Sequence, residues 1–251
     1  MTIKNEEELA GMREAGSVVQ RMLKAMRQAV RPGVTTAELD QVGADVMRQH
    51  GAQSAPASVY NFPGTSCISV NNEAVHGVPK RRKLHDGDLV KLDVTIEKNG
   101  FMADACITVP VGAVSKEKQR LMACAQQAFE LALLVARSGN PVSEIGRVVE
   151  REVNRCGFSV IRDLAGHGIG RTIHEQPSVP NYFDPRATQN LIAGMVITVE
   201  PIIAAGSGKS FIARDGWTVQ TTDGSASAHY EHTLMITDAE PIILTAGERL
   251  T

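Results

Sequence analysis

Long apolar runs, paired cysteines and an excess of charge of one sign are all lacking in this sequence of 251 residues. No apolar segment approaches the ~18 residues that a membrane span needs. The first residues, MTIKNEEELAGMREAG, are charged and amphipathic and contain no apolar core of a signal peptide. Twenty-six basic side chains nearly balance 28 acidic ones, so neither nucleic acid nor a membrane surface is favoured as a partner. We therefore expect a cytoplasmic protein.

Cysteines and aromatic residues are also scarce. The four cysteines form no Cys-x-x-Cys pair and no zinc-finger spacing, which predicts reduced and mostly buried thiols. Aromatic residues make up only 4% of the chain, and Trp217 is its single tryptophan. One basic run, residues 80–83, stands out, and a solvated loop explains it better than a contact with RNA or the ribosome.

The order of the expected elements is helix, helix, strands, and this order occurs twice. Expected helices cover residues 5–30, 35–50, 115–137 and 142–157, and expected strands cover 67–70, 88–97, 101–109, 195–200, 210–213, 217–221 and 230–237. The repeat predicts an α+β fold with two similar halves, about 1–110 and 111–251. Since no linker separates them, we expect one catalytic domain over 1–251 with a site between the halves.

A predicted β-hairpin places two aspartates together. Asn99-Gly100 is a strong two-residue hairpin signal between strand-like runs. Pairing outward from this turn sets Asp104 opposite Thr95, and Asp93 lies two residues from Thr95 on the same face. Asp93 and Asp104 are therefore diagonal neighbours, roughly 7–8 Å apart at the backbone. A single buried aspartate commonly pairs with arginine or caps a turn, but two on one apolar face favour a bound cation.

Two glutamates in the second half have similar surroundings. Glu200 ends the β-branched run GMVITVE, and Glu231 lies within the strand-like segment SAHYEHTLMITD. A glutamate on an apolar strand needs a partner. With Asp93 and Asp104 they make four carboxylates, a charge that two divalent cations would neutralise. Mixed carboxylate and imidazole ligands suit Mn, Fe, Co, Ni or Zn.

A glycine-rich stretch, residues 164–177, carries the histidines His167 and His174. The stretch alone is compatible with metal ligands or with a tight turn that happens to contain two imidazoles. A phosphate-binding loop is disfavoured, because the glycine spacing is not that of a dinucleotide site and no P-loop lysine follows.

Taken in order, these segments resemble the type I methionine aminopeptidases of metallopeptidase family M24. The resemblance rests on Asp93 and Asp104, then GHGIG at 166–170, TVEP at 198–201 and YEHT at 230–233, with HGVP at 76–79 and HEQP at 174–177 in support. It spans nearly the whole chain. The resemblance implies the pita-bread (creatinase/aminopeptidase) fold, which has an antiparallel sheet with helices outside and two pseudo-symmetric halves.

The resemblance further implies a dinuclear metal site. Its ligands would be Asp93, Asp104, His167, Glu200 and Glu231, with Asp104 and Glu231 bridging two divalent ions (Co, Mn, Fe, Ni or Zn). The glycines around His167 would let the backbone approach the site closely.

For the reaction, the resemblance implies removal of the N-terminal methionine from nascent proteins and peptides, with a preference for a small second residue. His174 would contact the scissile carbonyl, His76 would lie near the substrate amide, and Glu200 would shuttle a proton. The substrate pocket would contain Tyr60, Phe62, Cys67 and Trp217. A monomer is expected, and a contact with the ribosome is left open.

Three positions depart from the family pattern: Ile173 where an aromatic residue is usual, Ala105 after the second aspartate, and His229 where glutamine is common. His229 is interpreted as structural or as a neighbour of the ligands, and His232 as lying on the other strand face.

The spacing between His167 and Glu231 leaves no room for the insertion of type II enzymes, and the residues before Asp93 leave none for the N-terminal domain of prolidases. Alternatives are a binding protein that has lost catalysis and an aminopeptidase with another side-chain preference.

Overall fold

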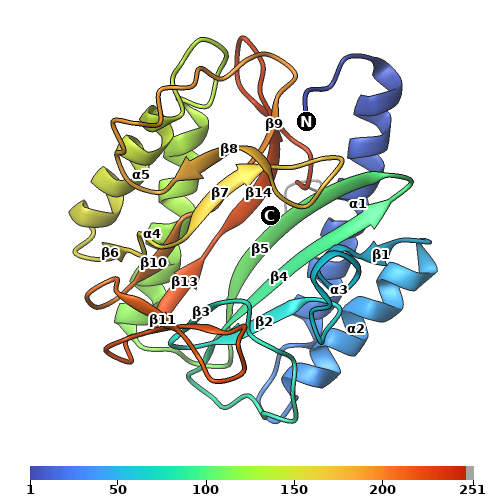
Figure 1. The fold of residues 1–251 in the computed structure, drawn as a ribbon. Coiled ribbons are helices and arrows are strands. Elements are labelled where there is room, and N and C mark those ends of the chain that lie inside the picture. Colours follow the sequence, from blue (N-terminus) through green and yellow to red (C-terminus); the bar gives the residue numbers. More distant parts are fainter. Residues whose placement is uncertain (247–251) are drawn as a thin grey trace.

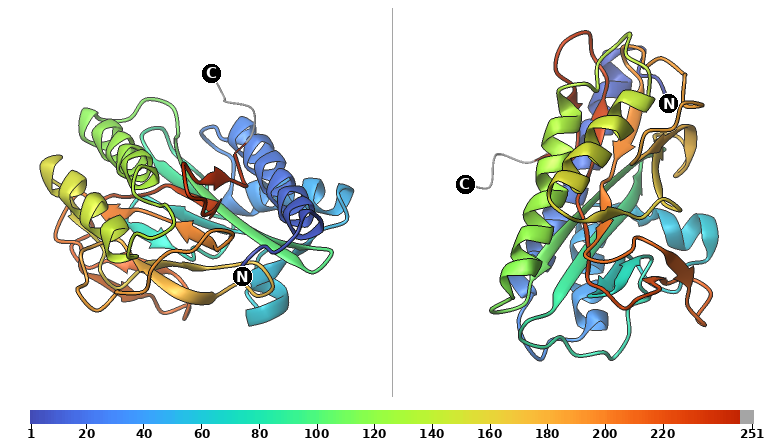
Figure 2. Two further views of the ribbon diagram at one scale, coloured as in Figure 1. Left: turned by 90° about the horizontal axis from the view of Figure 1, so that it is seen from above. Right: turned by 90° about the vertical axis from the view of Figure 1, so that its left-hand side faces the viewer.

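A computed structural model describes residues 1–246 of the protein, with four long helices on one side of a central antiparallel sheet (Figures 1 and 2). Residues 247–251, which the sequence analysis included in the second half, lie outside the described part. The helices are α1 (Glu6–Ala29), α2 (Thr36–Gln49), α3 (Ala55–Tyr60), α4 (Lys116–Leu133) and α5 (Ser143–Arg155). In this part of the chain no helix is long and apolar enough to cross a membrane.

The strands form one large sheet and two small ones. They are β1 (Gln53–Ser54), β2 (Cys67–Val70), β3 (Glu73–Val75), β4 (Leu89–Lys98), β5 (Phe101–Pro110), β6 (Ser159–Val160), β7 (Ala165–Gly168), β8 (Glu175–Pro180), β9 (Val196–Val199), β10 (Ile202–Ala204), β11 (Ser210–Ile212), β12 (Val219–Thr221), β13 (Ser227–His229), β14 (Glu231–Met235) and β15 (Ile242–Ile243). The nine-stranded sheet runs β1-β4-β5-β14-β9-β7-β8, with β2 beside β4 and β15 beside β14. The small sheets are β13-β10-β6 and β11-β12-β3. The pairing of β5 with β14 joins the first half of the chain to the second.

The helix starts follow local capping chemistry. The side chain of Asn5 accepts a hydrogen bond from the Glu8 amide at 2.9 Å, which caps α1. Thr35 and Glu38 form a reciprocal capping box at the start of α2. The four expected helices are present, although α4 ends at Leu133 rather than near 137, where the chain turns to bury Ala136. The short helix α3 was not expected.

The predicted hairpin is confirmed residue by residue. β4 pairs with β5 so that Lys98 faces Phe101 and Thr95 faces Asp104. Asn99 and Gly100 both have positive φ, 52° and 79°, as a two-residue hairpin turn requires.

Two apolar clusters pack the helices onto the sheets. One lies under α1 and α2 and contains Leu92 and Val94 of β4, and the other lies under α4 and α5. Because side chains alternate along a strand, Asp93 points to the face opposite Leu92, away from α1.

Cys67, Cys106 and Cys124 are buried and all four cysteines are free, as predicted. In the basic run, Lys80 and Arg82 form ion pairs with Glu73 at 3.7 and 2.9 Å.

The packing behind the hairpin yields a stability prediction. Leu92 is fully buried, whereas Leu134 is 54% exposed, so the two leucines form a matched pair. Leu92→Ala should lower the free energy of unfolding by about 2–5 kcal/mol, because truncation leaves a cavity under α1. Leu134→Ala should change it by about 0.5 kcal/mol or less. Denaturant titration of both variants measures the difference, and equal effects would contradict the assigned core.

Candidate metal centre

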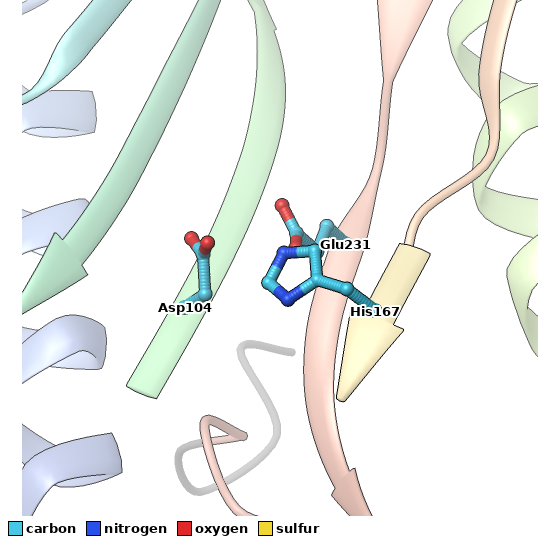
Figure 3. A group of neighbouring side chains, drawn as sticks. All are labelled: Asp104, His167 and Glu231. Atoms are coloured by element: carbon cyan, nitrogen blue, oxygen red, sulfur yellow. The ribbon is translucent and has the colours of Figure 1, made fainter. Parts of the chain in front are cut away.

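Five strands bring the predicted ligands into one cavity. Asp93 lies on β4, Asp104 on β5, His167 on β7 and Glu231 on β14, while Glu200 directly follows β9. All five line the same cavity, which encloses about 780 Å³ including space open to solvent. Figure 3 shows Asp104, His167 and Glu231 reaching into this space from three different strands. One ligand atom from each of these three lies within 4.8 Å of the others.

The four carboxylates repel one another in a buried setting. Burial raises the pKa of Asp104 to about 7, although hydrogen bonds from Thr95 and the Ala105 backbone act in the opposite direction. Burial and the neighbouring carboxylates raise the pKa values of Asp93, Glu200 and Glu231 well above the usual range. Within the described residues no lysine or arginine pairs with any of the four; only histidines lie within ion-pair distance of Glu200 and Glu231.

Two of these carboxylate oxygens lack any partner among the described residues. Asp104 Oδ1 and Glu231 Oε1 are buried and accept no hydrogen bond. A buried, unpaired carboxylate oxygen is costly, and such groups in proteins are paired or coordinate metals. The donor set therefore fits divalent metal ions.

His167 has the tautomer of a metal ligand. Its Nδ1 lies 2.9 Å from the carbonyl oxygen of Gly168, and a carbonyl only accepts, so Nδ1 carries the proton. Nε2 is then left with its lone pair, and it faces Glu200 Oε1 at 3.7 Å. Burial and the nearby His174 lower the pKa of His167 to about 4, which keeps the imidazole neutral. A fixed tautomer with Nε2 free is the usual arrangement for metal-binding histidine.

Glycines bring β7 close to its neighbours. A Cβ at Gly166 would lie 2.6 Å from the carbonyl oxygen of Thr198, and one at Gly168 would lie 2.2 Å from that of Gln176. Any side chain at Gly166 would clash with the backbone of β9, and any side chain at Gly168 would clash with the backbone of β8. The expectation that the glycines permit close backbone approach is confirmed.

Hydrogen bonds that the sequence analysis did not foresee orient the ligands. Thr198 Oγ1 donates to Glu200 Oε1 at 2.8 Å and accepts from the His167 amide at 3.0 Å. Asn181 donates to the Glu200 carbonyl at 2.8 Å. The Thr233 hydroxyl donates to the backbone carbonyl of Asp104 at 2.8 Å. Thr198 could have been found from the sequence, because it lies two residues before Glu200 on the same strand face.

His76 and His174 also line the cavity. The rings of His174 and His167 lie 4.3 Å apart between centroids. The Tyr60 hydroxyl is 2.6 Å from Nδ1 of His174, a contact between residues 114 positions apart. His76 has a φ of 56°, an unfavourable conformation for a residue with a side chain and one that is concentrated at functional sites.

The predicted substrate-pocket residues are found together. Tyr60, Phe62, Cys67 and Trp217 all line the cavity, and the rings of Phe62 and Trp217 meet edge to face at 5.3 Å. Ile173 is buried and also contributes to the wall. Ala105, by contrast, packs in the apolar cluster under α1 and does not line the cavity.

His229 lines the cavity beside the predicted ligands, which agrees with its interpretation as a neighbour of them. It is 2% exposed, and its Nε2 lies 3.2 Å from Glu231 Oε2. Burial lowers the pKa of His229 to about 3, so the imidazole is neutral. His232 instead contacts Phe129 and Thr245. The sequence signal was the spacing: His229 and Glu231 are two residues apart and share a face, while His232 does not.

Comparison with known proteins agrees with the site. The profile of metallopeptidase family M24 matches residues 10–238. The chain is 42% identical to methionine aminopeptidase of Clostridium perfringens over 97% of its own length and 98% of that protein. It is also 42% identical to methionine aminopeptidase 2 of Bacillus subtilis over 98% and 99% of the two chains.

A solved structure of methionine aminopeptidase from Rickettsia prowazekii superimposes with a TM-score of 0.94 at 35% identity, covering 98% of this chain and all of that one. The fold is therefore the pita-bread fold expected from the sequence. The chain belongs to metallopeptidase family M24.

Proposed function

We propose that this protein is a methionine aminopeptidase that removes the N-terminal methionine from nascent proteins and peptides. The observation that carries the proposal is the convergence of Asp93, Asp104, His167, Glu200 and Glu231 on one cavity that also contains His76 and His174. Full-length similarity to methionine aminopeptidases supports it.

The cofactor we propose is a pair of divalent ions, Co, Mn, Fe, Ni or Zn, which Asp93, Asp104, His167, Glu200 and Glu231 would hold. When bound, the ions would supply Lewis acidity and lower the pKa of water to near neutrality. Four carboxylates and one imidazole suit such first-row ions.

The chain's own residues would handle protons and position the substrate. Glu200, which lines the cavity, would take up a proton and pass it to the leaving amine. His174 would donate a hydrogen bond to the scissile carbonyl oxygen, where negative charge develops. His76 would orient the amide nitrogen.

Tyr60 would set the proton position on His174. If its hydroxyl donates to Nδ1 across the 2.6 Å contact, the proton of His174 must be on Nε2. Nε2–H is then available to the substrate carbonyl. Tyr60 thereby acts through His174 as a positioning residue.

The apolar wall formed by Phe62, Cys67, Ile173 and Trp217 suits an unbranched, flexible methionine side chain. A preference for a small second residue, a monomeric state, a contact with the ribosome and a location in the cytoplasm all stay predictions.

The activity is tested with a panel of peptides after reconstitution with each metal. Met-Ala peptides should release methionine with every competent metal, and Met-Lys or Leu-Ala peptides should react far more slowly.

Glu200→Gln should lower kcat by about 10²–10⁴-fold, because a general acid–base group is lost. Glu152→Gln is the control, since Glu152 is equally buried but pairs with Arg155 on α5. Absence of methionine release with all metals would contradict the proposal. Equal cleavage of Leu-Ala peptides would indicate an aminopeptidase with a broader side-chain specificity.

The role of Tyr60 is tested by removing one oxygen. Tyr60→Phe should lower kcat/KM by about 2- to 12-fold, corresponding to a net hydrogen bond of about 0.5–1.5 kcal/mol. Tyr182→Phe, whose ring contacts Arg162, is the matched control. In a His174→Ala background, Tyr60→Phe should have no further effect, because the two residues act as one unit. Additive losses would show that Tyr60 acts independently of His174.

The burial of Asp104 predicts a pH effect on the stability of the metal-free protein. The folded-state pKa of Asp104, about 7, exceeds the usual value of about 4, so its ionisation costs stability as pH rises through that window. Asp104→Asn should therefore stabilise the chelator-treated protein more at pH 8 than at pH 5, by on the order of 1–3 kcal/mol. The buried histidines also make the stability depend on pH, in the opposite direction. Because wild type and variant share these histidines, their contribution cancels when the two proteins are compared at the same pH.

Thermal or denaturant unfolding at the two pH values measures this difference. Asp184→Asn, which breaks an ion pair with the exposed Arg186, should show no such pH-dependent gain. Addition of Zn(II) should abolish the advantage of Asp104→Asn, because the ion neutralises the cluster in wild type. An advantage independent of pH and metal would contradict the burial argument.

A further inference from the structure

His229 has the geometry of a donor atom in the metal centre. Its Nε2 lies 3.2 Å from Glu231 Oε2 and 3.8 Å from Glu200 Oε2. One ligand atom each of Glu200, His229 and Glu231 lies within 4.8 Å of the others. Together with Asp104, His167 and Glu231, this makes two groups of three that share Glu231, and each group contains one imidazole.

Hydrogen bonding does not explain the position of the ring. Although Nε2 and Glu231 Oε2 are close, neither nitrogen of His229 has a hydrogen-bond partner among the described residues. Glu231 Oε1 is equally without one. Buried polar atoms that face a cavity without bonding to each other are the pattern expected of atoms aimed at a common ion.

The distances agree with shared coordination. Two donor atoms that each lie 2.0–2.2 Å from a zinc ion are about 2.8–3.6 Å apart at angles between octahedral and tetrahedral. The 3.2 Å separation of His229 and Glu231 falls inside this window, and the 3.8 Å to Glu200 corresponds to a wider angle.

The backbone holds His229 rigidly at this place. The Thr108 hydroxyl on β5 donates to the His229 carbonyl at 2.8 Å and accepts from its amide at 2.9 Å. On the other side, Ile202 of β10 pairs with His229. Ser227, two residues earlier on β13, accepts a hydrogen bond from the buried ammonium of Lys91 at 3.1 Å. A donor fixed from three directions loses little entropy on binding.

We propose that His229 is a sixth metal ligand: Nε2 of His229 binds one ion together with Glu200 and Glu231, while Nε2 of His167 binds the other with Asp104 and Glu231. The inference rests on the dinuclear metal centre of the proposed function, and it adds a sixth ligand to the five proposed there. A second imidazole should raise the preference for Zn, Co or Ni over Mn, because imidazole suits the former while oxygen donors suit the latter.

The test is ¹⁵N NMR of the histidine rings in protein loaded with two equivalents of ¹¹³Cd(II). A coordinated nitrogen is split by one-bond coupling to the metal, whereas a nitrogen that only donates a hydrogen bond to a ligand is not. Wild type should show two split Nε2 resonances. His229→Gln should lose one of them and His167→Gln the other. His232→Gln, which alters a histidine hydrogen-bonded to Thr245 outside the cavity, should keep both.

Metal affinity gives a second readout. His229→Gln should weaken binding of one of two Zn(II) equivalents by at least about 10-fold, the lower end of the loss seen even for outer-shell partners. The loss should be smaller for Mn(II) than for Zn(II).

The outcomes separate the two proposals. A single split resonance, lost in His167→Gln and kept in His229→Gln, would overturn the role of His229 even if methionine is released. No split resonance at all would contradict the metal centre itself. Two split resonances without methionine release would support His229 as a ligand and contradict the enzymatic function. Because the wild-type spectrum alone gives the count, the test stands even if a variant fails to fold.

Discussion

The four buried carboxylates of the cavity repel one another, and the fold must hold them together against this repulsion. Asp93, Asp104, Glu200 and Glu231 share one cavity, and no described lysine or arginine pairs with them. Burial raises the pKa of each, and neighbouring carboxylates raise the pKa values of Asp93, Glu200 and Glu231 further. Such charges separate unless the backbone prevents it. The backbone here does so because strands from both halves of the chain lie in one sheet, whose opposite face packs on α1 and α2. Bound cations would turn the repulsion into attraction.

Hydrogen bonds with neutral groups orient the side chains of this charged centre. Thr198 fixes one oxygen of Glu200, the Gly168 carbonyl fixes the tautomer of His167, and Tyr60 holds His174. Each of these groups acts on a residue that would touch metal or substrate. Oriented donors and acceptors need no rearrangement during a reaction, which is the main advantage of a preformed active site.

Local features of the fold could be predicted from the sequence, and distant contacts could not. The turn at Asn99-Gly100 fixes the register of β4 and β5, and so the relation of Asp93 to Asp104 follows from the chain alone. Helix starts follow from capping residues for the same local reason. The place of β7 depends on pairing with β8 and β9, and the contact of Tyr60 with His174 spans 114 residues, so no local pattern contains them. The interpretation of His229 as a neighbour of the ligands agrees with the 3.2 Å between its Nε2 and Glu231 Oε2.

The central claim, that the carboxylate cluster is a dinuclear metal site, is tested most directly by anomalous diffraction. Crystals of the protein grown with Zn(II) would be measured above and below the zinc absorption edge. Two anomalous peaks are expected inside the cavity, each about 2.0–2.2 Å from oxygen or nitrogen atoms of the named ligands, with Glu231 contacting both. Zinc found only on the outer surface, or a cavity with no anomalous peak at saturating metal, would contradict it.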